Sequence, residues 1–94
     1  MEDFDKLLHQ PIRTRIMSYL IGSESVDYTT LKKELGLSDG HMTTHMRELI
    51  SNDCVKVKKA FIDNKPKTTY NITSTGKKRF ADYVESLKQI ISLD

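Results

Sequence analysis

Hydrophobic residues recur at helical spacing most clearly between residues 38 and 52. The apolar positions of this stretch fall at i, i+4, i+7 and i+8, the spacing of one helix face: Met42, Met46, Leu49 and Ile50. The opposite side carries short or hydrogen-bonding side chains: Asp39, Gly40, His41, Thr43, Thr44 and Arg47. Ser38 is a good N-cap. The pattern predicts a helix that is anchored by one face and whose other face could lie in the major groove of DNA.

Two shorter helical patterns come before this helix. The first is expected from Pro11, whose missing N–H costs nothing at the first helical position, to Gly22. Its apolar residues repeat every four positions: Ile12, Ile16 and Leu20. The second would be capped by Thr29 or Thr30 and would end at Gly36. A short helix, a tight turn and a longer helix predict a helix-turn-helix over about residues 30–52.

After residue 53 the periodicity changes to that of strands. Alternating apolar and lysine residues predict a half-buried strand at 55–62, and KTTYNIT predicts a second strand at 67–73 with Tyr70 and Ile72 on one face. Residues 63–66 have turn chemistry. We therefore expect a hairpin over about residues 54–73, with Lys65 and Lys67 at its tip. Residues 26–28 could form a further short extended segment.

A long final helix is predicted over about residues 75–93, capped by Thr73 or Ser74. Its apolar stripe is broad: Phe80, Tyr83, Val84, Leu87, Ile90 and Ile91. Six large apolar residues exceed what one small domain easily covers, so we expect the distal half to pair with a second copy of the chain. The expected interface of this homodimer comprises Phe4, Leu8, Tyr83, Leu87, Ile90 and Ile91.

Length and composition indicate one small domain over residues 1–94. No apolar run approaches the ~18 residues of a membrane span. The acidic N-terminus lacks the features of a signal peptide, and the single cysteine, Cys54, cannot form an internal disulfide. We therefore expect a cytoplasmic protein without membrane contact.

The net charge of +2 conceals an uneven distribution. Residues 54–79 carry eight basic side chains against Asp63 alone, whereas the rest of the chain has seven basic and twelve acidic residues. Such a segment indicates a surface for a polyanion, although it could also be a solubilising strand pair. Lys77, Lys78 and Arg79 lie in the first turn of the last helix, where the dipole favours acids, which also suggests anion contact.

Three segments carry a family resemblance: LLHQPIRTRIMSYL, TTLKKELGLSDGHMTTHMREL and KTTYNITSTGKKRF. Together they resemble the small stand-alone winged-helix transcriptional regulators related to the MarR and ArsR families. The resemblance implies a mainly α fold with a two-stranded β wing (α+β) and a long C-terminal helix. It also implies a homodimer that binds operator DNA. Many relatives have glycine and an aromatic residue where this chain has Asp53 and Cys54, and Arg or Lys near Thr44, so the helix exit and the base preference do not carry over.

We expect sequence-specific binding of double-stranded DNA, as in a prokaryotic-type transcriptional regulator. The candidate contacts are Ser38, Gly40, His41, Thr43, Thr44, Arg47, Lys65 and Lys67. Arg47 could pair with guanine O6 and N7, whereas the threonines could meet phosphates or a thymine methyl. Each could instead be an ordinary solvated or ion-paired side chain. Secondary candidates for the DNA backbone are Arg13, Lys32 and Lys33.

Other classes of function have weaker support. His41 and His45 are four residues apart, but HMTTH lacks the glutamate of H-E-x-x-H and no further ligands are evident, so we expect no metal or cofactor. No nucleophile–base pair or Gly-rich phosphate loop suggests an enzyme. The alternative is a protein-binding winged helix without specific DNA recognition. Few aromatics accompany the basic residues, which disfavours a single-strand binder. The sequence does not identify an effector.

Overall fold

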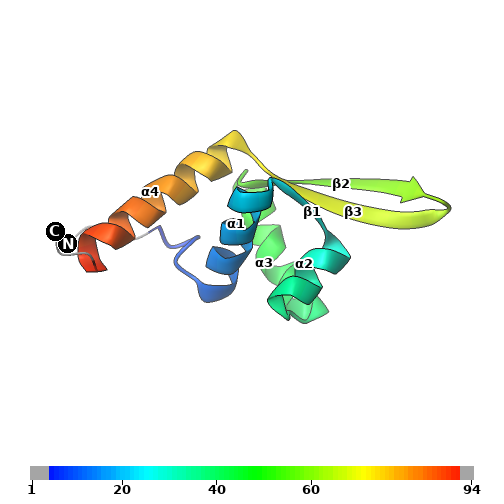
Figure 1. Cartoon of the computed structure of the whole chain (residues 1–94), viewed down its shortest axis with the longest axis horizontal. Helices are drawn as coiled ribbons and strands as arrows, with labels where there is room; N and C mark the ends of the chain where they lie inside the picture. The colour runs from blue at the N-terminus through cyan, green and yellow to red at the C-terminus, as the bar shows by residue number, and fades with distance from the viewer. Residues whose placement is uncertain (1–4, 92–94) are drawn as a thin grey trace.

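The computed structural model describes residues 5–91 of the chain. In chain order its elements are α1 (Pro11–Ser23), β1 (Ser25–Asp27), α2 (Tyr28–Leu35), α3 (Asp39–Ser51), β2 (Val55–Ile62), β3 (Lys65–Ile72) and α4 (Ser74–Ile91). The molecule is elongated, because the β2–β3 hairpin and α4 extend in opposite directions from a body that contains α1, α2 and α3 (Figure 1). The helix-turn-helix and hairpin predicted from the sequence are both present.

Local side chains set where the helices begin. The Gln10 side chain accepts a hydrogen bond from Arg13 N at 2.8 Å, ahead of Pro11 at the first position of α1. The cap of α2 is Asp27, whose carboxylate accepts from the backbone N–H and hydroxyl of Thr30. The predicted cap at Thr29 or Thr30 was therefore wrong, because the extended segment already ends at an aspartate that can serve this purpose.

The sheet has three antiparallel strands in the order β1-β3-β2, not the two expected. Ser25–Asp27 pairs with β3, placing Val26 opposite Tyr70. Both of these side chains are buried, which explains why so short a strand is held against the hairpin. The tip is a two-residue turn, since Ile62 pairs with Lys65 and both intervening residues have positive φ. The predicted turn was too long: residues 65–66 belong to β3.

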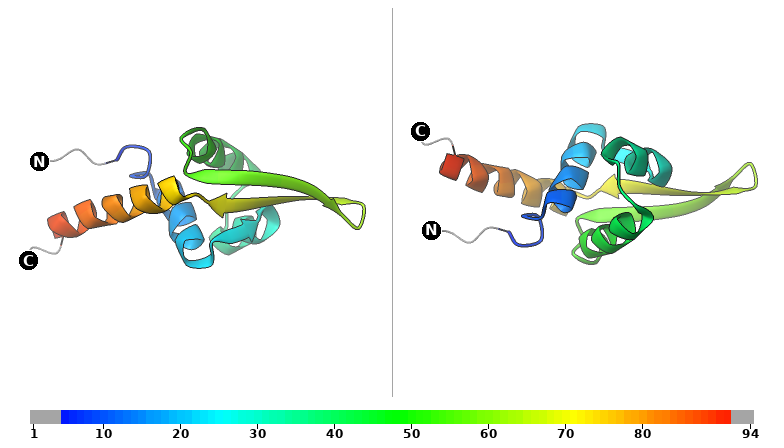
Figure 2. Two further views of the ribbon diagram at one scale, coloured as in Figure 1. Left: turned by 90° about the horizontal axis from the view of Figure 1, so that it is seen from above. Right: turned by 90° about the horizontal axis from the view of Figure 1, so that it is seen from below.

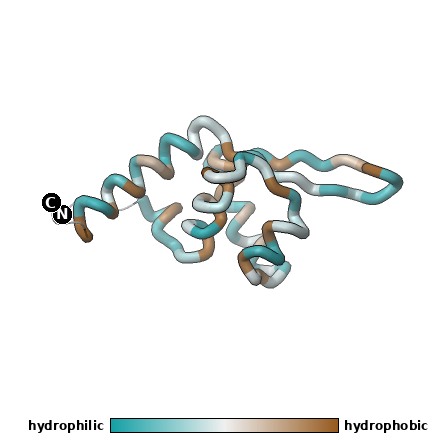
Figure 3. Tube along the Cα trace, viewed as in Figure 1, coloured by the Kyte–Doolittle hydropathy of each residue, from teal (hydrophilic) through white to brown (hydrophobic). Residues whose placement is uncertain are grey.

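The hairpin, which we call the wing (Val55–Ile72), leaves the body soon after it starts. Val55 is buried, but beyond it Val57, Phe61 and Ile62 are exposed, so the prediction of a half-buried strand is wrong for most of β2. Figure 3 shows a hydrophobic stretch next to the otherwise hydrophilic end of the wing. In β3, by contrast, Tyr70 and Ile72 are both buried, as predicted.

The exit of α3 has a left-handed residue, Asp53, with a φ of 61°. Glycine is the usual residue in this conformation. At Asp53 the chain therefore has the backbone conformation that glycine favours, but with an aspartate side chain. Cys54, which follows, is fully buried.

The last helix, α4, packs on the core along much of its length, since Val84 and Leu87 are partly buried against the core. Thr73 is its cap: the Thr73 hydroxyl accepts from Gly76 N at 2.8 Å. Gly76, Phe80 and Tyr83 are its buried residues, and its C-terminal end, with Ile90 and Ile91 exposed, projects from the body (Figure 2). No helix within residues 5–91 is long and apolar enough to cross a membrane.

Candidate nucleic-acid interface

The structure gives α3 the two sides predicted from its sequence. Met42, Met46 and Leu49 are buried, and Ser38 caps the helix by accepting from His41 N at 3.1 Å. All eight candidate contact residues lie at the surface: Ser38, Gly40, His41, Thr43, Thr44, Arg47, Lys65 and Lys67. The buried methionines and leucine fix the helix on the body, which leaves the polar side of α3 open to a partner.

His45 lies between the two sides of α3, where the charge of Arg13 on α1 acts on its ring. It is half-buried, and its Nδ1 has no hydrogen-bond partner within the described residues. Burial, followed by the charges of Arg13 and His41, lowers the pKa of His45 below its ordinary 6.5, so the ring is neutral at pH 7. Arg13 is also half-buried, with Nε unpaired among residues 5–91. Arg13 stays a secondary candidate for the DNA backbone.

A groove of about 430 Å³ separates α3 from the wing. Thr43 and Arg47 line it from the helix, and Lys59 and Thr68 line it from the hairpin. Its floor is apolar and aromatic: Tyr28, Met46, Ile50, Val57 and Tyr70. No ion pair engages Arg47 within the described part of the chain. Arg47 and Lys59, neither of them ion-paired within residues 5–91, therefore lie on facing walls of the groove.

Lys59 was not among the candidates from the sequence, although strand alternation could have identified it. Side chains on a strand alternate between faces, and residues paired across strands share a face. Lys59 pairs with Thr68 and lies two residues from Val57, which pairs with Tyr70. Once Tyr70 is assigned to the inner face, Lys59 must lie on the α3 side of the wing.

The other wing lysines lie on the opposite face. The register pairs Lys56 with Asn71, Lys58 with Thr69, Ala60 with Lys67 and Ile62 with Lys65. Lys58, Ala60, Ile62, Lys67, Thr69 and Asn71 together line a shallow cavity away from α3. The lysines of the wing are thus divided between its two faces. Lys59 lines the groove beside α3, and the outer face carries the others: Lys56, Lys58, Lys65 and Lys67.

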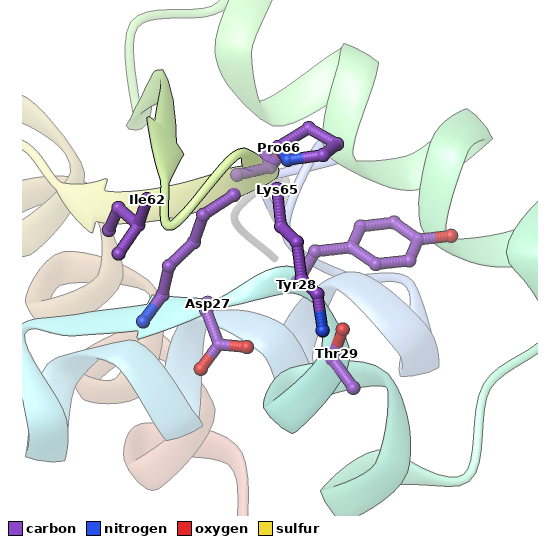
Figure 4. Close-up of a pocket in the computed structure, with 8 residues that line it drawn as sticks. Asp27, Tyr28, Thr29, Ile62, Lys65 and Pro66 are labelled. Carbon is purple, nitrogen blue, oxygen red and sulfur yellow. The ribbon is translucent and has the colours of Figure 1, made fainter.

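A second cavity, of about 350 Å³, lies where the wing tip passes the start of α2. Figure 4 shows Ile62, Lys65 and Pro66 of the hairpin around it, with Asp27 and Thr29 on the other side. The hydrogen bond from the Thr30 hydroxyl lowers the pKa of the Asp27 carboxyl, against opposing burial, and the charge of Lys67 adds to the lowering. Lys67 is therefore partly balanced by an acid, whereas Lys65 has no ion pair within residues 5–91.

An acidic group occupies the first turn of α3. Asp39 accepts from Lys32 Nζ at 2.8 Å and from the Tyr28 hydroxyl. The hydrogen bond to Asp39, with burial and the carboxylate charge, raises the pKa of Tyr28 to about 12. The contacts tie α2 to α3. They also leave Lys32 ion-paired, so the expectation that it contacts the DNA backbone loses support.

The basic residues at the start of α4 have intramolecular partners. Lys77 pairs with Glu24 at 3.0 Å, and Lys78 pairs with Asp82 at 3.1 Å. Arg79 binds both carboxylate oxygens of Asp5, with one contact at 3.0 Å. These pairs explain why cations are tolerated at a helix N-terminus, and they remove the reason for expecting an external anion there. The free cations of the basic segment are therefore those of the wing.

The chain shows no metal centre in the described residues. The rings of His41 and His45 are 6.2 Å apart between centroids. No group of three or more His, Cys, Asp or Glu side chains in residues 5–91 could hold an ion. The two histidines are better explained separately, with His41 exposed on the polar side of α3 and His45 half-buried.

Comparison with known proteins gives consistent matches over nearly the whole chain. The family described as winged helix DNA-binding domain matches residues 12–91. An uncharacterized protein of Methanocaldococcus jannaschii is 31% identical over 85 residues, covering 90% of this chain and 92% of that protein. A solved structure titled as a transcriptional regulator homologue protein from Pyrococcus horikoshii OT3 has a TM-score of 0.88 and 31% identity, covering 94% of this chain and 87% of that one.

A more distant solved structure, the AntR antimony-specific transcriptional repressor, shares the fold. Its TM-score is 0.64 at 18% identity, with 95% of this chain and 77% of that chain covered.

Proposed function

This chain belongs to the winged helix DNA-binding domain family, and from that premise we propose that it binds double-stranded DNA as a transcriptional regulator. The observation that carries the proposal is the groove between α3 and the wing, where Arg47 and Lys59 stand on facing walls without ion-pair partners among residues 5–91. The similarity to a transcriptional regulator homologue of Pyrococcus horikoshii supports the regulatory role.

In the proposed complex α3 lies in the major groove. Arg47 would pair with guanine O6 and N7, a contact that discriminates by about 1–3 kcal/mol. Thr43 and Thr44 are short enough for the helix to approach the bases, and Gly40 adds no side chain near its N-terminus. The wing then lies on the adjacent backbone or minor groove, where Lys59 would make the contact from the groove face and Lys65 and Lys67 would reach phosphates around the tip. Sequence would be read by α3, and affinity would come largely from phosphates.

We further propose that the protein acts as a homodimer through the distal part of α4. Ile90 is 44% exposed and Ile91 66% exposed, on a helix end that projects from the body (Figure 2). The expected interface is narrower than the sequence suggested. Leu8 and Tyr83 are buried in the protomer's own core and Leu87 is partly buried against it, which leaves Ile90 and Ile91 exposed; Phe4 lies outside the described residues.

A two-fold dimer would place two copies of α3 on one side of a duplex. Recognition helices that serve successive half-sites are about 34–36 Å apart. If two protomers together neutralise about 6–10 phosphates, affinity should fall by about 10³–10⁵ between 50 and 200 mM salt. The two-fold symmetry predicts a palindromic site, and the phosphate contacts predict a steep salt dependence.

The alternative is a winged helix that docks another protein. Phe61 and Ile62 favour it, because both are exposed at the wing tip. The alternative gives no role to the free cations of the groove, which is why we prefer DNA binding.

A gel shift on random-sequence duplex DNA at low salt tests the proposal. We expect the wild type to retard the duplex and Arg47→Ala combined with Lys59→Ala to lose most of the binding. Lys78→Ala is the matched control, because Lys78 is an exposed lysine paired to Asp82 on α4. Absence of retardation by the wild type, or equal loss in the control, would favour the protein-binding alternative. Selection of bound sequences from a random library would then define the site.

A further inference from the structure

Phe61 is a large apolar side chain that the fold leaves in water. It is 77% exposed, the highest value among the exposed large hydrophobic residues. It lies one residue before the end of β2 and pairs with Pro66 across the wing. An aromatic ring in this position adds little to the core and is open to contact with a partner.

The position of Phe61 connects it to the proposed DNA surface. Strand alternation puts Phe61 on the same face as Lys59 and Val57, both of which line the groove beside α3. The surface thus runs from Arg47 on the helix, across Lys59 on the hairpin, to Phe61 near the tip. The neighbouring strand adds Lys65 and Lys67 on either side of Pro66. Phe61 therefore shares its face with Lys59, while Lys65 and Lys67 lie close by in sequence on the outer face of the wing.

We propose that Phe61 is an apolar wedge that enters the minor groove and partly unstacks one base step. The inference rests on the proposed function and adds a residue and a DNA deformation to it. Phenylalanine is one of the side chains that proteins insert between base steps, and such insertion kinks the duplex by about 20–90° toward the major groove. At the step that Phe61 enters, the minor groove faces the wing, so this kink would bend the duplex away from the wing. The lysines near the ring would hold the flanking phosphates while it inserts.

Ile62 provides a matched control on the same hairpin. It is also exposed, at 51%, and is the next residue along the strand. Its register with Lys65 puts it on the outer face of the wing, away from α3. A wedge that depends on the groove-facing side requires Phe61 and not Ile62. A merely hydrophobic tip would use both residues alike.

The test compares wild type, Phe61→Ala and Ile62→Ala on pooled random-sequence duplexes of about 30 base pairs, labelled at both ends for energy transfer. We expect the wild type to shorten the end-to-end distance, Phe61→Ala to abolish the shortening and weaken binding roughly tenfold, and Ile62→Ala to keep both properties. Phe61→Leu should retain part of the bend, since leucine can also act as a wedge. Far-UV circular dichroism checks that each variant is folded.

The outcomes separate this inference from the proposed function. Retardation of duplex DNA by the wild type with equal end-to-end distances for wild type and Phe61→Ala would overturn the wedge and leave DNA binding intact. A Phe61→Ala variant that sediments with a lower mass but bends DNA normally would assign the ring to a contact between protein chains, which also overturns the wedge. A wild type that does not bind the duplex would refute both.

Discussion

Gly76 lies so close to Cys54 that a β-carbon at residue 76 would come within 2.2 Å of the Cys54 carbonyl oxygen. The same carbonyl accepts a hydrogen bond from Thr73 N at 3.0 Å. The Thr73 hydroxyl in turn donates to the Asp53 carbonyl and accepts from Gly76 N. The exit of α3 and the start of α4 are thus joined by backbone groups, and the joint has no space for a side chain at residue 76.

The first prediction follows from this contact. Gly76→Ala should reduce the free energy of unfolding by about 1–3 kcal/mol or more, because backbone must move to admit the methyl group. Urea unfolding measures the change. Gly22→Ala is the control: no atom lies within 4 Å of its added β-carbon, so alanine there should be neutral or stabilising by up to about 1 kcal/mol. Equal destabilisation by both substitutions would show that the joint is looser than described.

The features that were predictable from the sequence depend on neighbours in the chain. The apolar face of α3, its cap at Ser38 and the cap at Thr73 all arise from residues three or four positions apart. The tyrosine and isoleucine on the inner face of β3 follow from strand alternation. Such signals are local, so the helix-turn-helix, the hairpin and the polar side of α3 could be derived before the structure was known.

The features that were missed depend on residues far apart in the chain. The pairing of Val26 with Tyr70 makes a strand of three residues that no periodicity can reveal. Arg79 contacts Asp5, which is 74 positions away, so its charge could be mistaken for a free cation. The division of the wing lysines between two faces requires the register of β2 and β3. Free and paired cations cannot be separated by counting charge along the sequence.

The ion pair between Asp5 and Arg79 predicts a dependence of stability on acid pH. Burial opposes ionisation of Asp5, but hydrogen bonds from Arg79, Leu8 and Leu7 outweigh it and lower the pKa below 3.8. A carboxyl whose pKa is lower in the folded state contributes stability above its unfolded pKa of 3.8 and loses it as the pH falls through the folded pKa. Asp5→Asn should therefore cost about 1–2 kcal/mol at neutral pH, and much less in strong acid.

Denaturant titrations at several pH values would measure this difference. Asp63→Asn serves as control, because Asp63 lies in the wing turn and has no ion pair within the described residues. If the difference in unfolding free energy between wild type and Asp5→Asn stays constant down to the lowest pH, the charge of Asp5 is not what stabilises the contact.

Asp39 gives a prediction about DNA affinity. Its carboxylate lies in the first turn of α3, where a phosphate would otherwise meet the helix dipole. Asp39→Asn removes a repulsive charge and frees Lys32, so duplex binding at low salt should tighten roughly two- to fivefold. Asp82→Asn makes the same charge change on α4 and should leave the affinity nearly unchanged. Equal tightening by both variants would show that the effect comes from net charge and not from the position of Asp39.

The faces of the wing can be distinguished by salt dependence. Each lysine that neutralises a phosphate contributes about one unit to the slope of log Kd against log salt. Lys59→Ala should lower the slope by about one per protomer, because Lys59 lies on the groove side. Lys58→Ala removes the adjacent lysine on the outer face and should have a smaller effect. Binding measured by fluorescence anisotropy over a salt series would decide between them, and a larger loss for Lys58→Ala would place the duplex on the outer face.

The projecting end of α4 predicts the oligomeric state. Ile90→Asp together with Ile91→Asp should convert a dimer at micromolar concentration into a monomer, because two carboxylates cannot be buried without partners. The core should be unaffected, since the buried residues of α4 lie earlier in the helix. Sedimentation equilibrium measures the mass, and duplex binding should weaken at least tenfold when the two half-sites are no longer linked.

Ile21→Asp is a suitable control for this last prediction. Ile21 is 40% exposed, close to the 44% of Ile90, but it lies near the end of α1. The control should keep the dimer mass, because an added charge away from α4 does not disturb the proposed contact. A wild type that sediments as one chain would refute the dimer directly. A dimer that survives both substitutions in α4 but dissociates on Ile21→Asp would move the interface to α1, and the spacing of the two recognition helices would have to be derived again from that surface.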